Sequence, residues 1–292
     1  MLRRTALAGI LGVTMVVELF AMPIPPQVKQ CVAFIFGKLP NGKVSAGTGF
    51  FVGVKGAAHA DRYYVYLITA RHVLQLPDGK GYLAEVFVRL NKRDGSSDTI
   101  RIPMVRSGDK RTVYFPRDDS TDLAAIPMVP DQKVYEYLYL PDSMIVTRDM
   151  FKKIGVSEGS DVFFTGLFTP HIGEKRNDPI VRFGRVALVT PQQIQWQGSK
   201  IDLYLMETAS FGGNSGSPVF FYLGADRVPG SLVVGQPELY LAGVMKGTFN
   251  EQHPIETADP PKSVESLGIA AVVPAYQLHE LLFGPELSAL RK

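Results

Sequence analysis

A serine at the centre of a glycine-rich turn is the residue in this chain best suited to covalent chemistry. Ser215 lies in the segment Gly212–Pro218, with the sequence GGNSGSP, and strand-like apolar runs flank the segment on both sides. Its glycines lack a Cβ, so the backbone can adopt positive φ and let another group approach closely. We expect this turn to expose the Ser215 hydroxyl and to aim the backbone N–H groups of Gly213 and Ser215 at one point, as in an oxyanion hole.

A serine hydroxyl is a weak nucleophile at neutral pH unless a base lies beside it, and the base needs a partner that orients it. Two upstream segments supply candidates. His72 ends an apolar run within Leu67–Leu74, and Asp122 stands at the head of the apolar run that continues to Ile126. The chain order is therefore histidine, aspartate, serine, which differs from the order in subtilisin-like enzymes and in α/β-hydrolases.

Taken together, these segments resemble the chymotrypsin-like (trypsin-fold, PA clan) serine peptidases, and within them the bacterial glutamyl-endopeptidase and HtrA-type branch, here without the PDZ domain that many HtrA-type proteins carry. The resemblance rests on Thr69-Ala70-x-His72-Val73, Asp122-Leu123-Ala124 and Gly213-Asn214-Ser215-Gly216-Ser217-Pro218. It implies an all-β fold with two six-stranded antiparallel β-barrels and a C-terminal helix. It also implies a serine endopeptidase that cuts polypeptides through an acyl-enzyme intermediate and needs no cofactor or metal.

The resemblance assigns a role to each of these residues. His72 would be the general base, Asp122 its orienting partner and Ser215 the nucleophile, with the amides of Gly213 and Ser215 as the oxyanion hole. Further residues would line the substrate pocket: Ala209, Ser210, Met245, Lys246 and Gly247. Met245 stands where glutamate-cleaving members have histidine, which disfavours a glutamate preference. Lys246 could attract acidic residues, although we favour a strand-edge lysine that points into solvent.

Other residues could fill the same roles. Ser217 is the nearest alternative hydroxyl, and Asp118 or Asp119 could replace Asp122. The remaining histidines lie outside the Thr-Ala-x-His context: His59, His171, His253 and His279. At the level of the whole protein, a catalytically silent member of the fold that binds a peptide or partner is the main alternative. An esterase with a Gly-x-Ser-x-Gly elbow would need glycine at position 217.

Composition agrees with a β-rich protein. The 292 residues include 28 glycines and 21 prolines, which favours short strands and many turns over long helices. The net charge of +3 is spread without basic runs, so nothing indicates nucleic acid as a partner. Cys31 is the only cysteine, so an intrachain disulfide is excluded.

We expect four regions along the chain. Residues 1–26 combine a basic start with an apolar segment of about 15 residues, which is typical of an export signal or an uncleaved N-terminal anchor. This predicts a periplasmic or secreted protein, with membrane association only through that segment. Residues 27–135 would form the first barrel with His72 and Asp122, residues 136–155 the connection, and residues 156–292 the second barrel with Ser215 and the terminal helix.

Local patterns predict individual elements. An opening strand is expected over Val28–Phe36, a short strand over Thr112–Phe115, a polar loop over Asn250–Glu265 and a terminal helix over Gln277–Leu282. The aromatic and β-branched run Tyr63–Thr69 predicts a buried strand that leads to His72.

Overall fold

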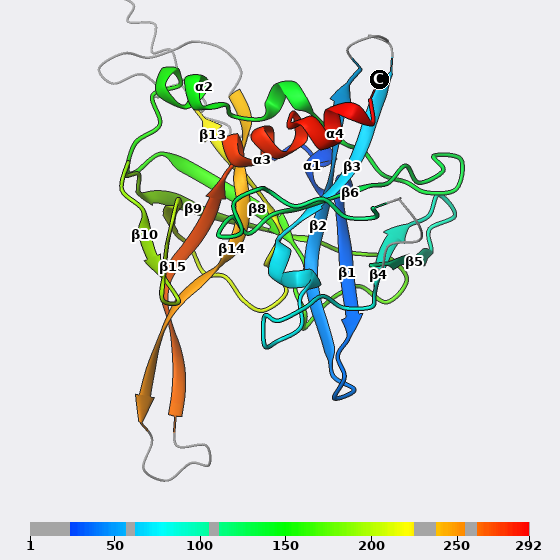
Figure 1. Ribbon diagram of the computed structural model, residues 1–292, viewed down its shortest axis with the longest axis horizontal. Helices are drawn as coiled ribbons and strands as arrows, with labels where there is room; N and C mark the ends of the chain where they lie inside the picture. The colour runs from blue at the N-terminus through cyan, green and yellow to red at the C-terminus, as the bar shows by residue number, and fades with distance from the viewer. Residues whose placement is uncertain (1–23, 57–61, 105–110, 225–237, 255–261, 292) are drawn as a thin grey trace, which may run out of the picture.

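The computed structural model describes residues 24–56, 62–104, 111–224, 238–254 and 262–291, and its strands fall into two groups (Figure 1). The first group is a curled sheet with the order β5-β4-β1-β2-β3-β6 and with β7 added in parallel to β2. Its strands are β1 (Val32–Lys38), β2 (Val44–Lys55), β3 (Tyr63–Thr69), β4 (Glu85–Asn91), β5 (Ser97–Pro103), β6 (Ala124–Pro127) and β7 (Leu140–Pro141).

The second group closes into an antiparallel barrel with the order β12-β15-β14-β13-β8-β9. Its strands are β8 (Asp161–Gly166), β9 (Ile180–Leu188), β12 (Tyr204–Glu207), β13 (Pro218–Leu223), β14 (Glu238–Pro254) and β15 (Lys262–Pro274). A separate hairpin of β10 (Ile194–Trp196) and β11 (Ser199–Ile201) precedes β12. The predicted all-β fold of chymotrypsin type is confirmed. Within the described residues, the first half is a curled sheet whose end strands β5 and β6 do not pair.

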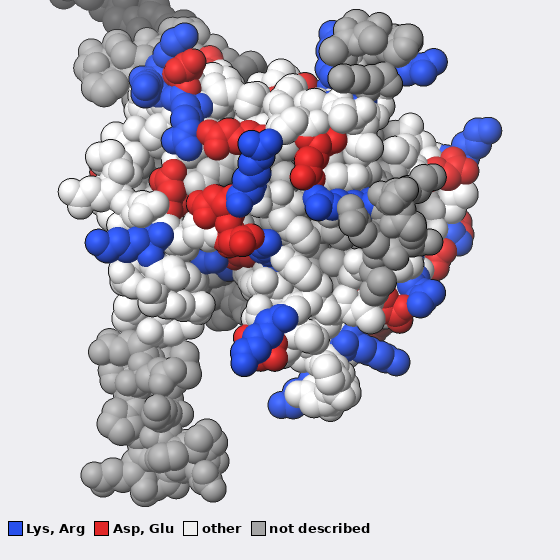
Figure 2. Space-filling view, viewed as in Figure 1, with Lys and Arg blue, Asp and Glu red and all other residues white. Residues whose placement is uncertain are grey.

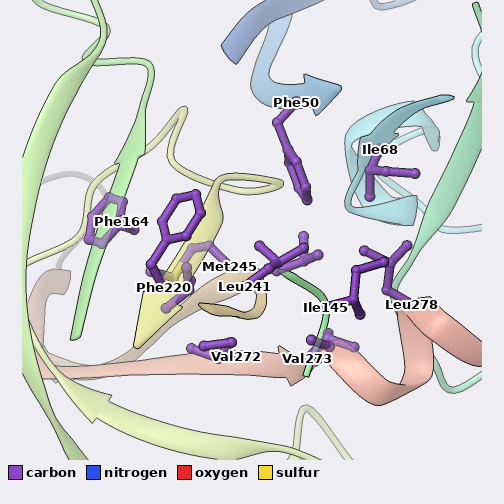
Figure 3. Close-up of a cluster of buried hydrophobic side chains, with 14 of the residues drawn as sticks. Phe50, Ile68, Ile145, Phe164, Phe220, Leu241, Met245, Val272, Val273 and Leu278 are labelled. Atoms are coloured by element: carbon purple, nitrogen blue, oxygen red, sulfur yellow. The ribbon is translucent and has the colours of Figure 1, made fainter. Parts of the chain in front are cut away.

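One apolar core extends across both groups of strands. Phe50 of β2 and Ile68 of β3 belong to the same buried cluster as Phe164 of β8 and Phe220 of β13 (Figure 3). All four side chains are fully buried. Because apolar burial contributes about 25 cal/mol per Å², this shared core stabilises the packing of the two halves as well as each half by itself.

Short helices connect and cover the strands: α1 (Gln27–Gln30), η1 (Arg71–Leu74), η2 (Asp142–Met144), α2 (Arg148–Lys153), α3 (Ala275–Leu282) and α4 (Pro285–Ala289). η1 carries His72 directly after β3, and α3 contains the predicted terminal helix. The C-terminal segment ends on the first sheet, where Arg291 donates a hydrogen bond to the Tyr66 hydroxyl of β3 at 3.0 Å.

Three element predictions were wrong. The segment that begins at Val28 first forms α1, and β1 starts only at Val32. Residues 112–115 make a single bridge, Tyr114 to Ala125, because Pro116 follows at once and lacks an N–H to continue a ladder. The expected loop from 250 to 265 instead contains the ends of β14 and β15, which pair out to Pro254 and Lys262. Backbone pairing needs no apolar side chains, so the polar composition gave no sign of it.

The predicted regions can be placed only in part. The connection 136–155 contains α2 and also β7, which pairs with β2 of the first sheet. The predicted N-terminal signal lies outside the described residues as far as residue 23. Within the described ranges, no helix is both long and apolar enough to cross a bilayer. Acidic and basic side chains are intermixed on the face shown in Figure 2.

Candidate active site

The serine turn has the backbone that its glycines were expected to allow. Gly213 has φ +97° and Gly216 has φ +86°, whereas Gly212 does not adopt positive φ. A Cβ at Gly216 would lie 2.1 Å from the Thr48 carbonyl oxygen and 3.0 Å from the Ala70 nitrogen. The turn is therefore pressed against the end of β3, two residues before His72.

Thr48 of the first half holds this turn through its side chain. The Thr48 hydroxyl of β2 donates to the Gly213 carbonyl at 2.8 Å and accepts from the Leu167 amide at 2.9 Å. On the other side, the backbone of Met245 in β14 binds the amide of Gly216 and the carbonyl of Ser217. The turn is thus fixed between the two groups of strands.

The structure brings His72 and Asp122 together. His72 Nδ1 lies 2.7 Å from Asp122 Oδ2, and the His72 backbone amide donates to Asp122 Oδ1 at 2.9 Å. The Asp122 side chain is 6% exposed, whereas the His72 side chain is 43% exposed. The imidazole is therefore oriented by a buried carboxylate and is itself accessible from outside.

The Ser215 hydroxyl contacts the backbone of β14. Its Oγ lies 3.3 Å from the Lys246 carbonyl oxygen, to which it donates. Within the described part of the chain, the amides of Gly213 and Ser215 donate no hydrogen bond. These are the two N–H groups that the sequence predicts for an oxyanion hole.

Lys246 differs from the expected solvent-exposed lysine. Its Nζ lies 2.8 Å from Asp122 Oδ2, and its side chain is only 12% exposed. Burial alone would raise the pKa of Asp122, but the His72 ring and the Lys246 ammonium beside it outweigh burial and hold the pKa of this carboxylate below its usual range. Asp122 is therefore an ionised group with two partners on one oxygen.

The other predicted pocket residues are placed unevenly. Ala209 is exposed and Gly247 is partly exposed, while Ser210 is buried and donates to Asn214 Oδ1 at 3.3 Å. The Met245 side chain is fully buried near Phe220 in the core (Figure 3). This corrects the expectation that it lines a substrate pocket, because strand alternation turns it inward.

The alternative residues have other surroundings. Ser217 Oγ is buried without a hydrogen-bond partner, beneath Gly166. Asp119 pairs with Arg71 at 2.9 Å, and Asp118 accepts from Ser120. The other histidines are remote in the fold or undescribed: His171 pairs with Asp178, His279 stacks on Phe283, the His253 side chain is not described, and His59 lies outside the described residues.

Sequence reasoning missed two residues that hold the site. The sequence pattern assigns no role to Thr48, which lies in the run Thr48–Phe51, or to Asn214, which lies in the serine turn. The Asn214 side chain is fully buried, donates to the Leu167 carbonyl at 2.6 Å and accepts from the Phe211 amide at 2.8 Å. A polar residue between turn glycines was the available signal for such a role. No cluster of three or more potential metal ligands occurs in the described ranges.

The chain belongs to the family of trypsin-like peptidase domains, whose model matches residues 47–225. That span includes His72, Asp122 and Ser215. The HtrA-type branch stays a prediction.

Solved protease structures are similar to this chain at low sequence identity. The MamO protease domain from Magnetospirillum magneticum has 17% identity and a TM-score of 0.48, covering 87% of this chain and 97% of that one. The protease Anisep from Arthrobacter nicotinovorans has 14% identity and a TM-score of 0.48, covering 89% and 96%. Tobacco etch virus protease has 12% identity and a TM-score of 0.47, covering 92% and 84%. No match was found among curated proteins.

Proposed function

We propose that this chain is a serine endopeptidase in which Ser215 is the nucleophile, His72 the general base and Asp122 the partner of the base. The observation that carries the proposal is the 2.7 Å contact from His72 Nδ1 to the nearly buried Asp122 carboxylate. A carboxylate in that position fixes the tautomer of the ring, so that the other ring nitrogen can accept a proton. Membership of a peptidase family supports the same reading.

The proposed reaction uses these three residues in turn. Ser215 Oγ forms a bond to the carbonyl carbon of a peptide while its proton moves to the free ring nitrogen of His72. Collapse of the tetrahedral intermediate breaks the C–N bond, and His72 returns the proton to the leaving amine. Water then attacks the acyl-enzyme by the same route and regenerates the Ser215 hydroxyl.

The negative oxygen of the tetrahedral intermediate needs hydrogen-bond donors that are free in the resting protein. The amides of Gly213 and Ser215 meet this requirement, because neither donates within the described chain. One such donor typically contributes about 3 kcal/mol to the barrier reduction.

A polypeptide is the substrate that this site suits best. Substrate would lie beside β14 near Gly247, which is partly exposed. The residues predicted to line the primary pocket include no carboxylate, which argues against a preference for basic residues.

A fluorophosphonate probe tests the proposal, because it modifies only an activated serine. The full chain is labelled at neutral pH and the modified peptide is mapped by mass spectrometry. We expect modification at Ser215, and its loss in His72→Ala and in Ser215→Ala. Ser217→Ala serves as the matched control and should be labelled. Folded protein that takes up no label would overturn the proposal and favour a silent member of the fold that binds a partner.

A further inference from the structure

Lys246 occupies an irregular position in β14. Met245 pairs with Val272 and Gly247 pairs with Ala271, so Lys246 is an extra residue in this strand at a β-bulge. A bulge bends the strand and re-aims the side chain of the extra residue. This explains why the lysine points toward Asp122 rather than into solvent.

The ammonium of Lys246 shares one carboxylate oxygen with the catalytic ring. Nζ lies 2.8 Å from Asp122 Oδ2, and His72 Nδ1 lies 2.7 Å from the same atom. Lys246 Nζ and His72 Nδ1 are therefore close to each other, because both contact the same oxygen atom. The centroid of the Trp196 ring lies 5.6 Å from Nζ, so one side of the ammonium faces an aromatic ring. Charges in such a poorly solvated place interact more strongly than at the surface.

The other charged groups around this pair have partners of their own. Arg71 of η1 pairs with Asp119 and contacts the Tyr82 hydroxyl. Asp118 accepts hydrogen bonds from Ser120. Asp202 follows β11 and lines the same small recess as Asp122 and Lys246. Its carboxylate accepts from Tyr276 and Gln277 of α3 and lies 4.0 Å from Arg148. Lys246 is thus the one described cation in direct contact with Asp122.

We propose that Lys246 is a positioning residue that acts through Asp122 and extends the activity of this site to lower pH, an inference that rests on the proposed serine peptidase function. A carboxylate beside His72 attracts a proton onto the ring. The Lys246 ammonium offsets part of that attraction, because protonating the ring would place a second positive charge on the same carboxylate oxygen. Loss of the Lys246 charge should therefore favour the ring that carries a proton, because Lys246 Nζ and His72 Nδ1 contact the same carboxylate oxygen.

This role also bears on specificity. The ammonium is occupied by Asp122, so Lys246 is not a free cation for an acidic substrate side chain. A preference for acidic residues, left open by the sequence, is not expected from this lysine.

The pH dependence of fluorophosphonate labelling tests the inference. Lys246→Met removes both the charge and the donor, Lys246→Gln keeps a donor without the charge, and Lys246→Arg keeps both. We expect the acidic limb of the labelling rate to move up by about one pH unit in the Met and Gln variants, and to stay in place in the Arg variant. Lys200→Met, at an exposed lysine of β11, is the control for lost net charge and should leave the limb unchanged.

A second readout needs no activity. In the Ser215→Ala protein, NMR titration of the His72 ring, assigned with a His72→Gln variant, should show a protonation midpoint about one unit higher when Lys246→Met is added. An unchanged midpoint and an unchanged limb would overturn the inference, as would an equal shift in Lys246→Arg. Failure of all labelling with a shifted NMR midpoint would instead refute the peptidase function and leave the charge coupling in place.

Discussion

The backbone amide of Thr48 donates a hydrogen bond to the carbonyl of Ser215 at 2.8 Å. Thr48 lies in β2 of the first sheet and Ser215 in the turn before β13, so the strand that neighbours β3 also fixes the serine. The Thr48 side chain adds two buried hydrogen bonds to the same region, one to Gly213 and one to Leu167. Ser215, the proposed nucleophile, is therefore held in part by the half of the protein that carries His72.

Thr48→Val should impair the site more than the fold. The substitution keeps the volume but leaves the Gly213 carbonyl and the Leu167 amide without their partner, at a cost of about 2 kcal/mol in the free energy of unfolding. A small displacement of the turn should lower the fluorophosphonate labelling rate about 100-fold. Urea unfolding and labelling kinetics measure the two effects. Thr169→Val, which removes an exposed 3.3 Å bond to the Gly212 carbonyl, is the matched control, and equal losses in both variants would contradict the prediction.

Gly216→Ala should prevent a normal serine turn. The residue has φ +86°, and the new Cβ would meet the Thr48 carbonyl oxygen at 2.1 Å. We expect destabilisation by more than about 4 kcal/mol, or failure to fold. Gly42→Ala is the control that carries the cost of positive φ without a steric clash. Gly42 has φ +79°, and a Cβ added there would have nothing within 4 Å. Thermal unfolding should show only about 1–2 kcal/mol lost there, and a comparable loss at both sites would refute the steric argument.

Asp122 should make stability depend on pH in the acid range. Its pKa is lower in the folded protein than in the unfolded chain. Its contribution is therefore present above about pH 4, the ordinary aspartate pKa, and is lost as the pH falls below that value. Asp122→Asn should lower the free energy of unfolding by about 3 kcal/mol at pH 7, because Lys246 loses its buried counter-charge. The difference from the natural protein should shrink in urea unfolding at pH 3.5. A difference that stays constant with pH would count against this assignment, and Asp78→Asn on an exposed turn is the control.

The Cys31 thiol should be unreactive in the folded protein. It is fully buried and donates to the Val28 carbonyl at 3.0 Å, and burial raises its pKa to about 12. Reactivity requires a thiolate and access. Ellman's reagent should therefore modify no thiol in the native state and one thiol in urea, and fast native modification would show that α1 and β1 pack less closely than described.

The fold class, the contact between His72 and Asp122, and the positive-φ turn around Ser215 could be predicted from the sequence, because glycine spacing and short apolar runs are local signals. It could not show what Lys246 does. A bulge in β14 decides the direction of that side chain, and the bulge depends on register with β15, which is a non-local property. Met245 was misplaced for a related reason, since only the pairing of β14 shows which alternate positions face the core. The outer parts of β14 and β15 were missed because their pairing is carried by the backbone.

The hydrogen bond from Arg291 to the Tyr66 hydroxyl joins the segment after α4 to β3 of the first sheet. This hydrogen bond and the core that both halves share couple the unfolding of one half to the unfolding of the other. The protein should therefore unfold in a single cooperative transition, in which the loss of serine labelling and the loss of β-sheet signal coincide at one denaturant concentration. Arg291→Ala should lower the denaturant concentration of that transition and leave the two signals coincident, because the shared core remains.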